Sequence, residues 1–227
     1  MDVIVDNAGL IAVAFATTLM LFLVSAIFSL LLGTLLAAMR VGPVAILRRA
    51  TATYVTVVRN TPLILIFIFF RFAGPKIGIQ FNWVDVVWGD VRMTAFFAAG
   101  AVSLILYTSA FVCEALRSGV NAVPLGQAEA ARAIGLTFGA AMTNVILPQS
   151  FRAALPPMAS VQIAMLKNTT VMGTFGVLEA FFRMRLLLND NATARYWIFA
   201  AFAVVFVVLV EILSFAANRL ERRWRIA

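Results

Sequence analysis

Histidine is absent from the sequence, cysteine occurs once, and charged residues make up only 12% of the chain. A lone cysteine, Cys113, excludes a disulfide within the chain, and without histidine no metal ligands are expected. No G-x-x-x-x-G-K-[ST] loop is present, so ATP is not bound by that route. Serine and glutamate are scattered without catalytic spacing, so no catalytic residues are expected either.

Apolar residues dominate what is present. The 227 residues are 63% hydrophobic, 20 of them are phenylalanine, and the mean hydropathy is +0.99. Soluble domains carry about 25% charged residues, so the composition indicates an integral membrane protein. Long uninterrupted apolar runs favour helices over a barrel. The net charge of +8 comes from 18 Lys and Arg that flank these runs, which is typical of topology signals rather than of nucleic-acid binding.

We expect one all-α transmembrane domain over residues 1–227. Its five spans are expected at about 10–39, 61–74, 93–113, 153–175 and 196–217. The first of them contains no charge and would form about 45 Å of helix, longer than the roughly 30 Å hydrocarbon core. It is also too long for a cleavable signal peptide, so none is expected.

The second span has an alternative placement. In the preferred one, Thr61 caps a helix that begins at Pro62, after a short amphipathic piece at residues 50–58. A single span over residues 50–70 would instead place Arg59 in the middle of the bilayer, which is costly.

Five spans place the two termini on opposite sides of the membrane. With the N-terminus outside, cytoplasmic segments hold eleven Lys and Arg and external segments hold six, while Lys167 falls within a span. The positive-inside rule therefore favours an external N-terminus and a cytoplasmic C-terminus.

Residues 118–149 are too polar to span a membrane and too apolar for an ordinary loop, and this topology makes them cytoplasmic. Pro124 suits the first position of a short helix, and Gly135 suits the left-handed stop after it. Thr137 can cap a second helix, which Pro148 is expected to end. From the residues alone, these two short helices form either a hairpin packed on the chain's own helix bundle or a projection that docks into a partner protein.

The motif spacing in this segment resembles the EAA loop of permease subunits in bacterial ABC importers. It consists of Glu129-Ala130-Ala131, Gly135 and Leu147-Pro148, with Val145 where the family usually has isoleucine. Four further segments resemble the class that takes up polar amino acids: Val58–Leu63, Glu114–Gly119, Val123–Gln127 and Lys167–Thr170. The likeness covers residues 10–220 and is strongest to the shorter of the two glutamate permease subunits.

The resemblance implies the five-transmembrane-helix permease fold, with residues 118–149 as a cytoplasmic coupling-helix loop. The residues that would couple to a separate ATPase dimer are Glu129, Ala130, Ala131, Gly135, Leu147 and Pro148. No cofactor would bind this chain, because ATP and Mg belong to the ATPase. The other implied partners are a second permease subunit, identical or different, an extracytoplasmic substrate-binding protein and lipid of the bacterial cytoplasmic membrane.

A basic residue lies deep in the fourth expected span. Lys167 is 11 residues beyond Pro156, about 16 Å along a helix, and a charge at such depth usually faces a cavity or the bundle interior. Together with Asn168, Thr169 and Thr170 it offers a cation and hydrogen-bonding groups that suit an acidic amino acid. We expect these four residues to line the substrate path.

Other roles stay open for the charged residues of the spans. Lys167 can instead pair with a helix carbonyl, Glu179 or Glu211, or snorkel to the interface, and Glu211 is expected to be interior and paired. Three more charged residues lie at the expected cytoplasmic ends of the second and third spans. They either form an inner gate or ion-pair network or anchor the helix ends: Arg59, Glu114 and Arg117.

By this resemblance the chain is a transport subunit rather than an enzyme, and it forms half of the path of an ATP-driven glutamate importer. Glutamine, aspartate and basic amino acids are the alternative substrates. A secondary transporter or channel that works without ATP is the alternative class, although it has no need of a docking loop.

Overall fold

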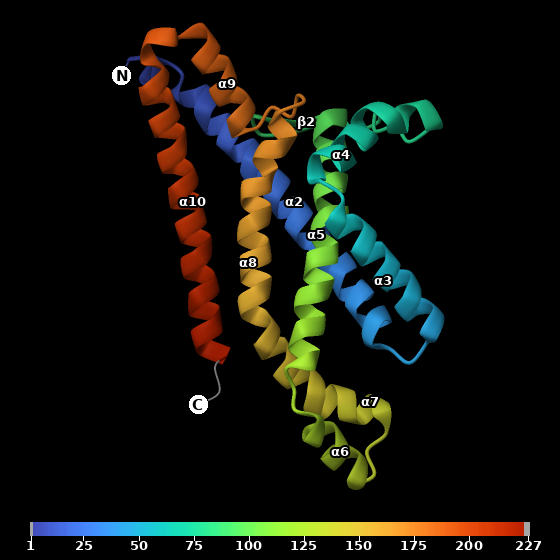
Figure 1. The fold of residues 1–227 in the computed structure, drawn as a ribbon. Coiled ribbons are helices and arrows are strands. Elements are labelled where there is room, and N and C mark those ends of the chain that lie inside the picture. The colour runs from blue at the N-terminus through green and yellow to red at the C-terminus, as the bar shows by residue number, and fades with distance from the viewer. Residues whose placement is uncertain (1, 225–227) are drawn as a thin grey trace.

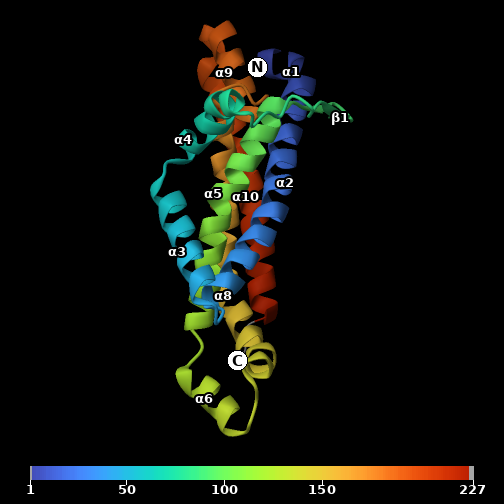
Figure 2. The ribbon, with the colours of Figure 1, turned by 90° about the vertical axis from the view of Figure 1, so that its right-hand side faces the viewer.

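Long helices lie alongside one another and form most of the structure, a computed structural model that describes residues 2–224 (Figures 1 and 2). The four longest helices are α2 (Ala8–Val41), α5 (Ala95–Asn121), α8 (Leu147–Gly173) and α10 (Arg195–Trp224). The shorter helices are α1 (Asp2–Asp6), α3 (Ala45–Asn60), α4 (Leu63–Ile68), α6 (Leu125–Ala133), α7 (Phe138–Ala141) and α9 (Ala180–Asp190). Single turns of π-helix (η1, Phe69–Ala73; η3, Met142–Ile146) and of 3₁₀-helix (η2, Gly74–Ile77; η4, Ala192–Ala194) connect some of them.

Three helical segments of the described chain are both long and apolar enough to cross a membrane by themselves. They are α2, α5 and the stretch Ala192–Trp224. They contain the spans expected at 10–39 and 196–217 and, because α5 begins at Ala95, all but the first two residues of the span expected at 93–113. Helix α8 covers the span expected at 153–175 as far as Gly173 and lies beside α5, but it does not meet the same criterion of apolarity (Figure 1). The count of five spans therefore stays a prediction.

The stretch expected as the second span, 61–74, is helical from Leu63 and is separate from the helix before it. Helix α3 and the helical stretch Leu63–Ile77 meet at an angle of 101°, and only together do they have the length and composition of a span. The expected cap at Thr61 is wrong, because its hydroxyl donates to the carbonyl of Val57 at 2.8 Å. Pro62 disfavours helical geometry in the residue before it, which explains why the break falls here.

One short hairpin interrupts the otherwise helical fold. Strands β1 (Val86–Trp88) and β2 (Val91–Met93) pair antiparallel within the connection that leads to α5. Trp83 and Trp88 are 81% and 67% exposed there, as expected for side chains at a membrane interface. The hairpin lies at the same end of the bundle as α4 and α9 (Figure 2).

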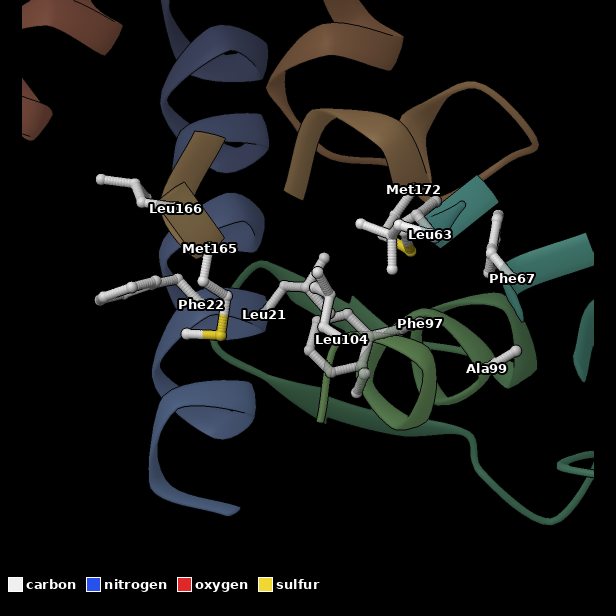
Figure 3. Packing of buried hydrophobic residues seen from close by; sticks show 12 residues of the cluster. Leu21, Phe22, Leu63, Phe67, Phe97, Ala99, Leu104, Met165, Leu166 and Met172 are labelled. Carbon is white, nitrogen blue, oxygen red and sulfur yellow. The ribbon is translucent and has the colours of Figure 1, made fainter. Parts of the chain in front are cut away.

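The core fills the space between α2, α4, α5 and α8 (Figure 3). Leu21, Leu104, Met165 and Met172 are almost completely buried in it. Because lipid is as apolar as these side chains, close packing rather than removal from water holds the helices together. At Gly119 an added Cβ would lie 2.4 Å from the carbonyl oxygen of Ser150, so α5 and α8 touch backbone to backbone.

A buried acid, Glu179, closes the connection between α8 and α9. Its carboxylate accepts the backbone N–H groups of Phe181 and Phe182 at 3.0 and 2.9 Å, which caps α9. The hydroxyl of Thr18, on α2, accepts the N–H of Ala180 at 3.0 Å. Burial raises the pKa of Glu179 to about 7, although the hydrogen bonds from the two amides act to lower it.

We expect this acid to make the stability depend on pH. Between its unfolded pKa of 4.5 and its folded pKa of about 7, Glu179 binds a proton only in the folded state, so the free energy of unfolding falls as the pH rises through this window. The substitution Glu179→Gln should reduce that fall. Thermal unfolding of the purified protein in detergent at several pH values measures it, with the exposed Glu129→Gln as control. The same pH dependence in the wild type and Glu179→Gln would contradict this assignment.

Candidate functional site

Two short helices project beyond the long ones at the end of the bundle opposite α9 (Figure 1). Helix α6 follows Pro124 and ends where Gly135 adopts a left-handed conformation, with φ of +85°. The hydroxyl of Thr137 then accepts the N–H of Ala140 at 3.3 Å, which caps α7. Both the glycine stop and the threonine cap confirm the local structure predicted from the sequence.

The expected end of the second helix at Pro148 is wrong. A π-helical turn, Met142–Ile146, links α7 to α8, and Pro148 lies in the first turn of α8 instead. Proline is tolerated there because the first N–H groups of a helix have no partner within it. The projecting loop is therefore continuous with a long helix of the bundle, not separated from it by a helix break.

The motif residues of this loop lie mostly at its surface. Glu129, Ala130 and Gly135 are exposed, and so are the paired residues Leu147-Pro148 at the start of α8. Ala131 differs, because only 4% of it is exposed. Large apolar side chains add to the exposed surface of the loop: Leu125, Ile134 and Phe138. The loop has the exposed, partly apolar surface that a protein partner would cover.

A network of charged side chains joins three helices near the loop. Glu114 of α5 accepts hydrogen bonds from Arg40 at the end of α2 and from Arg117, whose Nη2 lies 3.0 Å from its carboxylate. Arg59 at the end of α3 lies 3.9 Å from the same carboxylate. The structure thus brings together the predicted Arg59, Glu114 and Arg117.

Sequence reasoning missed Arg40 in this network. As the first charge after a long apolar run, it has the position of a simple interface anchor. Helix α2 continues to Val41, however, and this carries Arg40 alongside α5, where it meets Glu114. Only the way the helices pack supplies that contact.

Two cavities lie along the face formed by α3, α5 and α8. The first, of about 450 Å³, is bordered by the four residues of the charged network together with Thr56 and Asn60. Three guanidinium groups against one carboxylate leave a surplus of two positive charges there. The second, of about 240 Å³, is bordered by Tyr107, Ser160 and Asn168. Phe111 borders both, so together they form a strip of cavities along the bundle, which is polar at the first cavity and largely apolar at the second.

The four residues expected to line the path face different ways. Asn168 borders the cavity beside α5, whereas Lys167 and Thr170 border a separate groove beside α10. Thr169 is fully buried, and its hydroxyl donates to the carbonyl of Leu166 at 2.7 Å. Neighbouring helical residues point about 100° apart, so a four-residue motif on one helix divides between faces.

Glu211 is exposed and not interior, contrary to expectation, because α10 packs loosely over much of its length. It borders the same groove as Lys167, but the two charges form no ion pair within 4.0 Å in the part of the chain that the structure describes. Glu179 caps α9, so it is not the partner of Lys167 either.

The sequence is similar to those of known transport proteins. Residues 29–226 match the family described as binding-protein-dependent transport system inner membrane component. The chain is 41% identical over 214 residues to the glutamate transport system permease protein GluC of Corynebacterium glutamicum, and the match covers 92% of each chain. It is 31% identical to the probable glutamine ABC transporter permease protein GlnM of Bacillus subtilis, with 98% of this chain and 96% of that one covered.

Solved structures show the same fold. The crystal structure of an amino acid ABC transporter with histidines aligns with a TM-score of 0.85 at 25% identity, over 97% of this chain and 96% of the other. An inward-facing structure of the MetNI methionine ABC transporter aligns with a TM-score of 0.74 at 20% identity, over 97% of this chain and 99% of the other.

We expect Glu114→Ala to destabilise the protein by roughly 2 kcal/mol, because it removes hydrogen bonds to charged groups and leaves three cations close together. Thermal unfolding in detergent measures the loss. Asp85→Asn is the matched control, since it breaks the exposed Asp85–Arg92 pair and should change little. Equal effects of the two substitutions would argue against a special role for Glu114.

Proposed function

The chain belongs to the family of binding-protein-dependent transport system inner membrane components, and we propose that it forms half of the membrane path for glutamate in an ATP-driven importer. It is a multi-pass permease subunit of an amino-acid ABC importer, and so a transport component rather than an enzyme. The name of the C. glutamicum relative supports glutamate as the substrate. Related polar amino acids are the alternative, and the B. subtilis relative, named for glutamine, supports that substrate.

The cavity bordered by Arg40, Arg59 and Arg117 is the observation that supports an acidic substrate. Glutamate presents two carboxylates and one ammonium group, so it is attracted to a wall with surplus positive charge, whereas a basic amino acid is repelled. Arg59 is the most available of the three arginines. It lies over the ring of Phe111 and has no short hydrogen bond to Glu114, so its N–H groups are free to bind a carboxylate.

The path follows the strip of cavities between α3, α5 and α8. On this proposal Asn168 lines it and Arg59, Glu114 and Arg117 form the inner gate, where Arg40 supports Glu114. Lys167 and Thr170 form the adjoining wall beside α10. A substrate that competes for Arg59 would loosen the hold of Glu114 on the end of α3 and so favour opening.

The projecting loop is the coupling element. Glu129, Gly135 and the exposed apolar side chains beside them would contact a separate ATPase dimer, which would bind ATP and Mg. Because α7 continues through a π-turn into α8, movement of the loop would be passed directly to the path wall. Alternating access then follows from closure and opening of the ATPase pair.

The remaining partners follow from the arrangement of the bundle. One five-span subunit is too small to enclose a path, so a second permease subunit would face the strip of cavities. The coupling loop lies at the opposite end from α1 and α9 (Figure 1). With the loop in the cytoplasm, α1 and the N-terminus would be external and the C-terminus cytoplasmic. The external end would then receive a substrate-binding protein.

Arg59→Gln should lower glutamate uptake by about tenfold, because it removes a charge-assisted contact to a carboxylate. Uptake of labelled glutamate by the complete transporter in cells measures the effect, with each polar amino acid tested as competitor. Arg48→Gln is the control, since Arg48 binds only the carbonyls of Gly42 and Pro43 and lies outside the cavity. Uptake that continues without ATP on an ion gradient would instead support a secondary transporter or channel.

Substitutions in the coupling loop should separate insertion from transport. Glu129→Ala combined with Gly135→Ala should leave the chain in the membrane but abolish uptake, because alanine is strained at the positive φ of Gly135 and the contact surface loses its acid. Thr143→Ala, also on the exposed part of the loop, should transport normally. Membrane content, co-purification of the ATPase and uptake are measured together, and normal uptake in the double variant would refute the coupling role.

A further inference from the structure

Arg71 is held in an unusual position at the end of the bundle opposite the coupling loop. It belongs to the π-turn η1, which follows α4. Its guanidinium carbon lies 3.6 Å from the centre of the Phe96 ring and 5.2 Å from the centre of the Phe72 ring. A cation this close to a ring face is attracted to it, so the two aromatic side chains fix the guanidinium in place.

The rings of Phe72 and Phe96 form an aromatic platform under the guanidinium, and the connection between α8 and α9 packs against both rings. Gly176 has a φ of +104°, and an added Cβ there would lie 2.8 Å from the Phe96 ring, so the connection between α8 and α9 presses directly on that ring. Phe72 packs edge-on against Phe175 of the same connection, with ring centres 6.0 Å apart. The position of the guanidinium is therefore built by three segments of the chain.

No anion of the described chain balances this charge. Among the side chains of residues 3–224, no carboxylate lies within 4.0 Å of Arg71. Its Nε is shielded from solvent and has no hydrogen-bond partner. A guanidinium that is partly removed from water and lacks an acceptor is costly, so such a group is normally completed by an anion.

The other arginines at this end differ from Arg71. Arg92 makes two hydrogen bonds of 2.8 Å to Asp85, and Arg185 donates to the carbonyl of Thr174 at 3.2 Å. Both are exposed to solvent. Arg183 and Arg195, also at this end, do not lie over an aromatic ring of the described chain and have no shielded, unpaired nitrogen, so Arg71 alone among these five arginines combines an aromatic platform with an unused, shielded donor.

We propose that Arg71 binds a carboxylate of the amino-acid substrate as it enters the path from the external side. Of the three guanidinium nitrogens only Nε is shielded, so the two Nη groups remain accessible and together can donate to the two oxygens of a carboxylate. Arg71 then acts at the external mouth, whereas Arg59 acts at the opposite, inner part of the path. This inference rests on the proposed function for its substrate and for its external location.

The test uses the complete transporter, with both permease subunits, the ATPase and the binding protein, reconstituted in liposomes. Arg71→Gln removes the charge, and Arg71→Lys keeps the charge but loses the paired N–H donors of the guanidinium. Arg92→Gln is the control at the same end. Three quantities are measured: uptake of labelled substrate, ATP hydrolysis, and the affinity of the substrate-loaded binding protein for the complex. Membrane content of each variant confirms that it folds.

Arg71→Gln should lower uptake about tenfold or more, Arg71→Lys should lower it less, and Arg92→Gln should not change it. The affinity for the loaded binding protein should stay the same in all three. Unchanged uptake in Arg71→Gln would overturn the proposal. A parallel loss of affinity for the binding protein would also overturn it, since the anion would then belong to that partner.

The result separates this inference from the proposed function. If the wild type transported glutamine and not glutamate, the proposal that glutamate is the substrate would be wrong. The same experiment would still test carboxylate binding by Arg71, because every amino acid has an α-carboxylate.

Discussion

The carboxylate of Glu114 joins the ends of three helices, and much of the structure depends on it. It binds Arg40 of α2 and Arg117 of α5 and lies within reach of Arg59 at the end of α3. Charges within a membrane are tolerated when opposite charges or hydrogen-bond donors surround them. This one acid therefore makes it possible for three arginines to lie around a single cavity, and it attracts the end of α3 toward the bundle just before the chain bends.

Features that depend on local sequence could be predicted. Uninterrupted apolar runs located the long helices α2, α5 and α10 because their length and composition are sufficient signals. The stop at Gly135 and the cap at Thr137 followed from the conformations that these two residues favour. The motif around Glu129 gave the family, which the comparisons confirm.

Features that depend on packing could not be predicted. The contact of Arg40 with Glu114 joins residues 74 positions apart, and no local pattern marks it. The sequence places Lys167 and Asn168 in one motif, but the direction in which each points depends on how α8 is rotated against α5 and α10. Pro148 predicts a helix end because proline stops most helices, whereas a π-turn before it lets the chain continue into α8.

The unbroken passage from the loop into α8 has a mechanical consequence. Helix α8 has 27 residues, about 40 Å at 1.5 Å per residue, and Gly119 allows it to touch α5 near its first turn. Contact near one end makes the helix a lever with a long far arm, and Pro156 and Pro157 in its interior are the points at which it can bend. A tilt of about 5° would move the far end of a rod of this length by roughly 3 Å, about the width of a water molecule. Small displacements at the loop end of α8 would thus be magnified at Met172 and the buried Glu179 beyond it.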